Sequence, residues 1–410
     1  MSANLASLLK PQSWKGHRWL GSDLVQGDPR FDCALELLLK QGLPASQHLG
    51  AVHLGCGAWL GSSSADRILA IHPFAEEHEA FVCNAGIVES SSHMRGSPQT
   101  VAYSSTGSID PRKCEDGRNN GNPVVSLVAS PLDNLSELAQ CDTVILRIFR
   151  DMDLNWMWID SLWRQMAVGA RLHVFGAKDD GIHSLEKRVA SLGIAVEPEA
   201  VGCHSRWFTM EKTASKPSFP LPPAQQQVLV ATPQGKFDLW IPEGVFSAGR
   251  LDIGTALLLE NLGEVAEKRI WDLGCGAGII ARSALELGAA RVFASDHSAL
   301  AVKSSVHNLA AFPERAQVGL HFLGDGVQGD FDLILSNPPF HLESRELRNF
   351  GKVWLVACLE HLAQGGEIRL VCNGFLPYAQ FAQDLGLQAE TLIERAGFKV
   401  WKLTRMARKV

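Results

Sequence analysis

A short polar segment that ends an apolar run late in the chain carries the groups best suited to chemistry. Residues 331–336 are mostly apolar and are followed at once by Asn337, Pro338, Pro339 and Phe340. The apolar run is typical of a buried parallel strand. Two successive prolines fix two φ angles and remove two N–H donors. We therefore predict a strand whose carboxyl end leads into a rigid, extended segment.

That segment offers two hydrogen-bond acceptors and an aromatic ring. The side-chain oxygen of Asn337 and the backbone carbonyl of Pro338 are expected to lie close together, with the Phe340 ring beside them. Two acceptors can hold both hydrogens of a planar primary amine and favour a tetrahedral nitrogen with a free lone pair. Such a nitrogen can attack a methyl donor in line, so the tetrad predicts N-methylation. Taken alone, it is equally compatible with an ordinary turn, because Asn before Pro favours turns.

A glycine-rich turn upstream predicts a second functional element. Residues 272–278 read Asp-Leu-Gly-Cys-Gly-Ala-Gly, with glycines at Gly274, Gly276 and Gly278, between an apolar run and a helical pattern. Glycine lets the backbone turn sharply and lets a ligand approach the main chain. The third glycine follows the second by two residues rather than three, so the dinucleotide pattern Gly-x-Gly-x-x-Gly is missed. We expect Asp272 and these glycines to bind a cofactor.

Two further acidic residues follow at the spacing of a βαβ unit. Asp296 ends the apolar run 291–295, where a carboxylate can accept both hydroxyls of a ribose. Asp325 precedes the strand of the tetrad and is expected to meet an adenine amino group. Ligands of open α/β sheets bind at the carboxyl ends of the strands. The four strand-end features are therefore expected to meet at one edge of a sheet.

Composition places the chain among globular proteins of two domains. It has 410 residues, 46% of them hydrophobic and 20% charged, and a net charge of −6. That charge argues against indiscriminate coating of nucleic acid, although the basic end from Lys399 could meet phosphates or simply be solvated. We find no run of eighteen apolar residues, no signal-peptide pattern and no Cys-x-x-Cys pair, so we expect a cytoplasmic chain without membrane partner, disulfide framework or metal.

The two halves of the chain repeat one another. A linker rich in Pro and Gln is predicted at 213–234, between domains 1–212 and 235–410. Both domains read as α/β units with strands expected at 51–54, 67–71, 143–148, 171–175, 269–273 and 291–295, and a polar loop is expected at 89–123. The letters Leu-Gly-Cys-Gly-Ala occur at 54–58 and again at 273–277, and 141–150 corresponds to 331–340.

The first half lacks the chemical groups of the second. His53 stands where Asp272 does, His72 stands roughly where Asp296 does, and residues 147–150 stand where the tetrad does. We therefore expect the N-terminal domain to be a degenerate copy that serves as a scaffold or binds the substrate.

With these motifs in hand, the second half resembles class I S-adenosylmethionine-dependent methyltransferases, and the whole chain resembles the ribosomal RNA small subunit methyltransferase C family. The resemblance is carried by segments 244–247, 251–254, 273–278, 336–341, 373–378 and 398–400, and in the first half by 174–184. It implies two tandem Rossmann-like class I methyltransferase domains, the N-terminal one degenerate and used for RNA docking. The long polar insertion at 89–123 departs from the family pattern.

The resemblance also implies a function. Its cofactor would be S-adenosylmethionine, bound by Phe246 and by the glycines and acids named above. Its substrate would be the exocyclic N2 amine of a guanine in 16S ribosomal RNA, free or in the small ribosomal subunit. The tetrad from Asn337 to Phe340 would be catalytic, and the chain would act as a monomer. His341, the one candidate for a base beside Asn337, is expected instead to pack or contact RNA, because its position in the sequence lies past the two acceptors.

Other functions remain open from the residues alone. A tetrad of this type serves any planar amine, so methylation of adenine N6 or of a glutamine side chain is an alternative. A non-catalytic RNA-binding assembly factor is another, although Asp272, Asp296 and Asn337 are all intact. A nicotinamide oxidoreductase is disfavoured by the glycine spacing.

Overall fold

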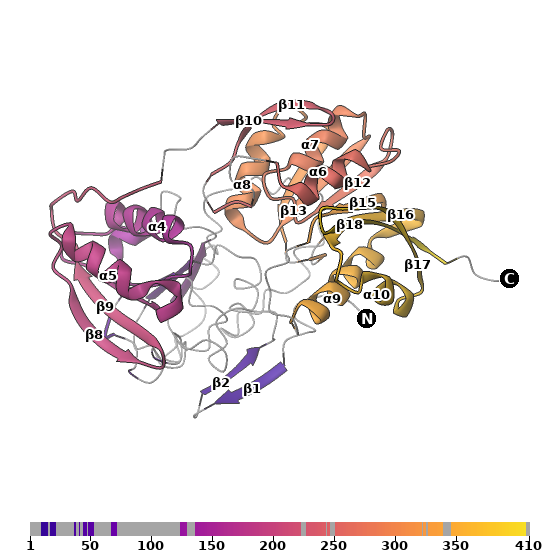
Figure 1. Cartoon of the computed structure of the whole chain (residues 1–410). Helices are drawn as coiled ribbons and strands as arrows, with labels where there is room; N and C mark the ends of the chain where they lie inside the picture. Colours follow the sequence, from indigo (N-terminus) through magenta and orange to yellow (C-terminus); the bar gives the residue numbers. More distant parts are fainter. Residues whose placement is uncertain are drawn as a thin grey trace, which may run out of the picture. The chain divides into compact units, whose positions relative to one another are not determined.

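The chain forms two compact units, each built around its own sheet (Figure 1). The computed structural model describes residues 10–14, 17–21, 37, 41, 44–46, 48–52, 67–71, 124–128, 136–222, 227–242, 244–246, 251–321, 323–324, 327–338 and 346–406. The boundary between the units falls between residues 222 and 227. In the part so described, no helix combines the length and apolar character needed to cross a membrane.

The C-terminal unit contains a seven-stranded mixed sheet in the order β14-β13-β12-β15-β16-β18-β17. Its strands are β12 (Arg269–Leu273), β13 (Arg291–Asp296), β14 (Ala316–Leu320), β15 (Phe331–Ser336), β16 (Leu362–Asn373), β17 (Leu387–Arg395) and β18 (Phe398–Arg405). Strands β12 to β16 are parallel, and β18 is antiparallel to β16 and β17. The order reverses between β12 and β15, so their carboxyl ends flank the crevice where such sheets bind ligands.

Helices cover both faces of this sheet (Figure 1). One face carries α6 (Ile253–Glu260), α7 (Ile279–Glu286) and α8 (Ala299–Asn308), and the other carries α9 (Glu346–Glu360) and α10 (Tyr378–Asp384). Alternation along the strands feeds both layers. On β12 and β13, Ile270 and Val292 belong to the core shared with α6 and α7, whereas the next residues, Trp271 and Phe293, lie outside that core and both contact the Phe331 ring.

The N-terminal unit contains a second seven-stranded sheet, in the order β5-β4-β3-β6-β7-β9-β8. Its strands are β3 (His48–Val52), β4 (Arg67–Ile71), β5 (Val124–Val128), β6 (Thr143–Arg147), β7 (Arg171–Ala177), β8 (Glu197–Gly202) and β9 (Ser205–Glu211). Position by position, its order and its parallel and antiparallel pairings match those of the C-terminal sheet. The two sheets thus share one topology.

Helices and turns of the N-terminal unit enclose an aromatic core. Within the described residues they are η3 (Ser136–Gln140), α4 (Met152–Gln165), η4 (Lys178–Asp180) and α5 (Ile182–Ser191). Helix α4 begins at the N-cap Asp151, whose side chain accepts from the Leu154 N–H. It buries Trp156 and Trp163, and both rings contact Phe219. A short hairpin, β1 (Lys10–Trp14) with β2 (His17–Gly21), lies outside the two large sheets.

Most expected elements are confirmed, with shifted ends. Strands β4, β6, β7, β12, β13 and β15 and helix α7 lie where the sequence predicts them, and the strand expected at 51–54 is β3, three residues earlier. The stretch 213–234 differs from a plain linker, because β10 (Gln227–Thr232) pairs there with β11 (Gly235–Trp240). This hairpin bonds to α8 through Asn308, whose amide contacts both the N–H and the carbonyl of Trp240. The expected loop 89–123 lies outside the described residues.

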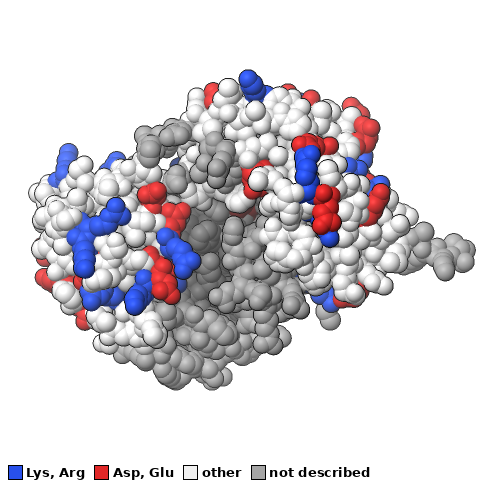
Figure 2. Space-filling view, viewed as in Figure 1, with Lys and Arg blue, Asp and Glu red and all other residues white. Residues whose placement is uncertain are grey.

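Up to residue 406, where the described part of the chain ends, the basic residues near the C-terminus are paired. Lys399 lies 3.4 Å from Glu394, and Lys402 lies 3.8 Å from Glu367. Arg405 donates to backbone carbonyls of residues 359 and 362. Figure 2 likewise shows Lys and Arg side chains beside Asp and Glu on the viewed face of the C-terminal unit. Neighbouring carboxylates therefore offset the basic charge of β18.

Candidate active site

Asn337 lies at the carboxyl end of β15, flanked by β12 and β16. The preceding residue, Ser336, anchors this point of the sheet. Its hydroxyl donates to the Leu273 carbonyl at 2.7 Å and accepts from Trp354 Nε1 at 3.0 Å. The strand end is thus fixed against the end of β12 and against α9. Pro338 follows and is buried.

The side-chain amide of Asn337 is held on its nitrogen side only. Its Nδ2 donates to Thr255 Oγ1 at 2.9 Å and to Asp252 Oδ2 at 3.2 Å. Its Oδ1 is buried and accepts no hydrogen bond from the part of the chain that the structure describes. Buried polar atoms are nearly always paired in folded proteins. An acceptor left open at a strand end is therefore suited to a ligand that donates.

Asp252 and Thr255 belong to the start of α6. Asp252 is the N-cap, and its Oδ2 accepts the Thr255 N–H at 2.9 Å. The Thr255 hydroxyl points at the same oxygen, at 3.4 Å. Neither residue was predicted as a site residue. The available signal was an acidic residue directly before an apolar helix, which indicates an N-cap but not a contact with Asn337.

The glycine-rich turn connects β12 to α7 in a conformation that favours glycine. Gly274, Gly276 and Gly278 have φ values of 77°, 54° and 78°, in the left-handed region that side chains disfavour. A Cβ on Gly278 would lie 2.9 Å from Ser305 Oγ, whereas a Cβ on Gly276 would meet no atom within 4 Å. Gly278 is thus required by packing. Gly276 faces open space where a ligand can approach the backbone.

Asp272 is fully buried below this turn. Its Oδ2 accepts the Ala281 N–H at 2.9 Å, and its Oδ1 has no partner among the described residues. Burial raises the pKa of Asp272 from 3.8 to about 7, the Ala281 hydrogen bond opposes this, and the nearby Asp296 charge adds to it. A cationic group that reached Oδ1 would offset the desolvation cost of the buried carboxylate.

Asp296 lies at the end of β13 and is only 9% exposed. One of its oxygens accepts the Gly276 N–H and the other accepts the Ser298 N–H, both at 2.9 Å. Each oxygen of a carboxylate can accept a second hydrogen bond. Asp296 is therefore oriented by the backbone and can still accept from a diol.

The predicted site residues fall into three groups. The structure brings Asp272, Asp296, Asn337, Pro338 and the three glycines to the carboxyl edge of neighbouring strands. The predicted residues Pro339, Phe340 and Asp325, with His341 and His53 and His72 of the first half, lie outside the described residues. Phe246 is 54% exposed, and within the described chain it takes no part in this hydrogen-bond network.

Two exposed apolar side chains border the same edge. Ile253, between Asp252 and Gly254, is 56% exposed, and Phe375, just beyond β16, is 77% exposed. The start of α6 lies next to the end of β16. A Cβ on Gly254 would lie 3.3 Å from the Phe398 ring, and Phe398 pairs with Asn373, the last residue of β16. The rim of the site therefore presents apolar surface to a bound group.

In the N-terminal unit the corresponding strand end is different. If the two Leu-Gly-Cys-Gly-Ala segments are aligned, Ala51 corresponds to Ile270, and these pair with Ile145 and Leu333. Four residues after this pair, Phe149 occupies the position of Asn337. The sequence alignment places residue 147 there, so the structure shifts the correspondence of residues 147–150 with the tetrad by two positions. The backbone N–H and carbonyl of Phe149 bond to the side chain of Asn155. No amide side chain projects from this position.

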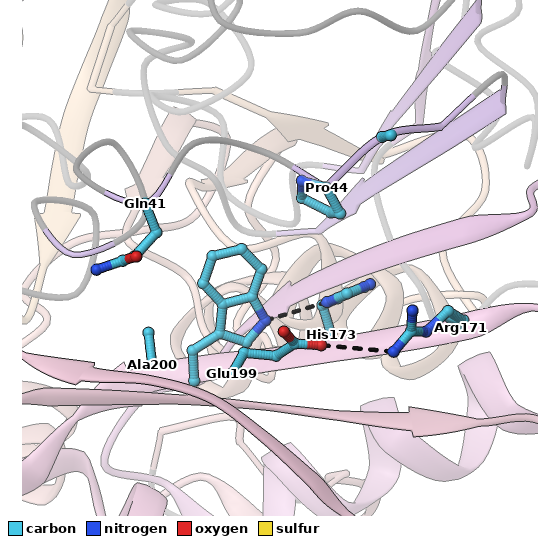
Figure 3. Close-up of a pocket in the computed structure, with 8 residues that line it drawn as sticks. Gln41, Pro44, Arg171, His173, Glu199 and Ala200 are labelled. Carbon is cyan, nitrogen blue, oxygen red and sulfur yellow. Dashed lines mark hydrogen bonds and ion pairs between the residues drawn. The ribbon is translucent and has the colours of Figure 1, made fainter.

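A cavity of about 350 Å³ lies within the N-terminal unit (Figure 3). It is lined by Gln41, Pro44, Ala45, Arg171, His173, Glu199, Ala200 and Trp207. His173 Nδ1 accepts from Trp207 Nε1 at 3.1 Å, and burial lowers the pKa of His173 to about 4. Since Arg171 pairs with Glu197 and Glu199, the polar groups here bind one another. We interpret this histidine as structural.

Comparison with known proteins places the chain among methyltransferases. Residues 236–402 match the family model described as "Methyltransferase small domain". The chain is 32% identical over 268 residues to the ribosomal RNA small subunit methyltransferase C of Pseudomonas entomophila, spanning 64% of this chain and 79% of that protein. It is 32% identical to the protein of the same name from Haemophilus influenzae, spanning 59% of this chain and 73% of the relative.

A solved structure extends the likeness to both units. The T. thermophilus 16S rRNA N2 G1207 methyltransferase, in complex with AdoMet and guanosine, superposes with a TM-score of 0.75 and 21% identity, covering 99% of this chain and all of that one. At this identity the match establishes a shared fold. The α/β architecture described above is thus a methyltransferase fold.

Proposed function

Because this chain belongs to the ribosomal RNA small subunit methyltransferase C family, we propose that it transfers a methyl group from S-adenosylmethionine to the exocyclic N2 amine of a guanine in 16S ribosomal RNA. One observation carries the proposal. The side-chain oxygen of Asn337 is buried and has no hydrogen-bond partner among the described residues. The bonds of Nδ2 fix its direction at a strand end beside the glycine-rich turn. An acceptor in this position suits a donor amine.

The residues at the edge of the sheet fit S-adenosylmethionine. The open side of Gly276 leaves room for a ligand against the backbone. The unpaired Asp272 Oδ1 suits the cationic amino group, and Asp296 suits the ribose hydroxyls. Gly274 and Gly278 shape the turn, and we assign Phe246 and Asp325 to the cofactor on the family resemblance. When bound, the sulfonium supplies an activated methyl group.

The chain's own groups then act on the amine. Asn337 Oδ1 accepts one amine hydrogen and the Pro338 carbonyl accepts the other, which draws the nitrogen toward a tetrahedral shape with its lone pair free. Phe340 stacks on the base, as aromatic side chains do on unstacked nucleobases. Pro339 keeps the segment extended. The amine loses its proton to water after attack, so no side-chain base is required.

The N-terminal unit is proposed to be a degenerate copy of the catalytic domain that docks the RNA. Its sheet has the same strand order, and Phe149 replaces the amide at the strand end. Figure 2 shows Lys and Arg side chains, with Asp and Glu among them, on the viewed face of this unit. Exposed Lys187 and Arg188 of α5 are among its basic residues, and basic side chains bind phosphates.

We extend the proposal to partners and compartment. The substrate is 16S ribosomal RNA, either free or assembled in the small ribosomal subunit, and the reaction takes place in the cytoplasm. The chain acts as a monomer, since each expected part of the site comes from one C-terminal unit.

Product identification tests this function. The full-length protein is incubated with methyl-labelled S-adenosylmethionine and small ribosomal subunits or 16S ribosomal RNA that lack the modification, and the RNA is digested to nucleosides. We expect label in N2-methylguanosine. Label in N6-methyladenosine, or in glutamine of a ribosomal protein, would replace the substrate assignment, and no label in any fraction would contradict the enzymatic role.

A further inference from the structure

The orientation of the Asn337 amide depends on residues outside the tetrad. An asparagine amide has nearly the same shape when its oxygen and nitrogen exchange places, and only its hydrogen-bond partners decide between the two orientations. Turned over, Asn337 would present an NH₂ group to the substrate amine, donor facing donor. Methyl transfer through the Asn337 oxygen therefore requires a device that selects one orientation.

The start of α6 contains such a device. The Asp252 carboxylate can only accept, and its Oδ2 lies 3.2 Å from Asn337 Nδ2 and 3.4 Å from Thr255 Oγ1. The Thr255 proton is therefore directed to Asp252, which leaves a lone pair of the hydroxyl to accept from Asn337 Nδ2 at 2.9 Å. Two donor groups thus make three hydrogen bonds, which lead to the carboxylate either directly or through the Thr255 hydroxyl. This arrangement accepts the NH₂ side of the amide and rejects the oxygen.

The device is rigid because it is also part of the helix start. The same Oδ2 caps α6 by accepting the Thr255 N–H at 2.9 Å. Helix α6 is in turn anchored in the core, with residues 257 to 259 at most 1% exposed. Thr255 is 7% exposed, so water competes poorly for its hydroxyl.

We infer that Asp252 and Thr255 are positioning residues for methyl transfer, which lock the Asn337 amide with its oxygen toward the substrate amine. The inference rests on the proposed function, because it assigns a task to Asn337. It adds two residues from a separate helix, 85 and 82 positions away in sequence. Neither needs to touch substrate or cofactor.

Single-turnover methylation with the full chain tests the inference, with unmethylated small ribosomal subunits and labelled S-adenosylmethionine as probes. Thr255→Val preserves the shape of the side chain but removes the hydroxyl. Asp252→Ser retains an N-cap but is too short to reach Asn337. For both we expect the transfer rate to fall about 10- to 100-fold, as for a misoriented reacting group, with cofactor affinity and KM for the subunit unchanged.

Matched variants separate positioning from general damage. Thr255→Ser retains the hydroxyl and should restore the rate to within about threefold of wild type, the scatter expected when one hydrogen bond is preserved. Thr232→Val makes the same kind of substitution at β10, where the hydroxyl donates to the Gly235 carbonyl, and should transfer at the wild-type rate. A slow Thr255→Ser, or a Thr255→Val as fast as wild type, would overturn the inference.

A double-mutant cycle supplies a readout that a purely structural role does not move. If Thr255 acts through Asn337, Thr255→Val should slow the enzyme in the wild-type background but add nothing to Asn337→Ala. Additive losses would contradict the inference. Failure of wild type itself to methylate would instead contradict the proposed function, so the two outcomes remain distinct.

Discussion

At the scale of single residues, the site is defined by two buried oxygen atoms that have no hydrogen-bond partner among the residues that the structure describes. Asp272 Oδ1 lies below the glycine-rich turn and Asn337 Oδ1 lies at the end of β15. Leaving a buried acceptor unpaired costs about 1–3 kcal/mol. A ligand that donates to both atoms would regain that free energy, so we expect these two positions to favour ligand binding while lowering the stability of the ligand-free protein.

If Asp272 binds the amino group of the cofactor as proposed, cofactor binding should depend on pH. Its pKa of about 7 lies above the ordinary 3.8, so the carboxyl is largely protonated below pH 7 and cannot attract a cationic amino group. We expect the affinity for S-adenosylmethionine to fall by up to about tenfold per pH unit below 7, and binding near pH 7 to release a proton. Calorimetry in two buffers of different ionisation enthalpy measures both effects.

Asp272→Asn is the control for that prediction. The variant should bind more weakly and lose the pH dependence of affinity. It should also change stability without ligand. Because folding raises the Asp272 pKa, its contribution is present below pH 4 and is lost as pH rises through 7. At pH 8 the variant should therefore unfold at higher denaturant concentration than wild type, and an unchanged pH profile of affinity would contradict the assignment.

At the scale of elements, the carboxyl edge of the sheet positions the site. Within the glycine-rich turn at that edge, different glycines are required for different reasons. Gly276 and Gly278 both have positive φ, but only Gly278 is closely packed. Gly278→Ala should therefore lower the free energy of unfolding by about 2–5 kcal/mol, from left-handed backbone strain and overpacking against Ser305. Chemical denaturation measures this loss.

Gly276→Ala should behave differently. Its cost in stability is the backbone strain alone, about 1–2 kcal/mol, but the new methyl group enters the space left for the ligand. We expect cofactor affinity to be lost more severely than stability, as calorimetry and denaturation on one sample will show. Retained affinity in Gly276→Ala would mean that the cofactor does not approach this part of the turn.

The sequence predicts these elements better than the contacts between them. Strands β12, β13 and β15 and the glycine turn follow from apolar runs and glycine spacing, which are local signals. The bonds from Asn337 to Asp252 and Thr255 join residues more than eighty positions apart, and no local pattern specifies such a contact. The hairpin β10–β11 is an exception, because its signal is local: Val228, Val230, Phe237 and Leu239 alternate with other residues on either side of a turn that contains Gly235.

At the scale of the whole molecule, the division of labour between the units gives a prediction. If the N-terminal unit docks the RNA, Lys187→Ala with Arg188→Ala on α5 should weaken binding to 16S ribosomal RNA and reduce the salt dependence of the affinity. For every phosphate that the variant no longer neutralises, the slope of log K against log salt should fall by about 0.7–0.9. Filter binding across a salt series measures this slope.

Lys236→Ala on β11 provides the matched control, an exposed lysine of the C-terminal unit. It should leave RNA affinity unchanged, and all three proteins should bind the cofactor equally. A double variant of α5 that binds RNA like wild type would show that docking does not use this helix.

The central claim is that the Asn337 oxygen acts on the substrate amine as the methyl group moves. Single-turnover kinetics of Asn337→Ala, at saturating cofactor and small ribosomal subunit, test it most directly. An acceptor that acts only in the transition state should cost about 100- to 1,000-fold in transfer rate when removed, while the dissociation constants of cofactor and subunit stay at their wild-type values. A variant that transfers methyl groups at the wild-type rate would contradict the account.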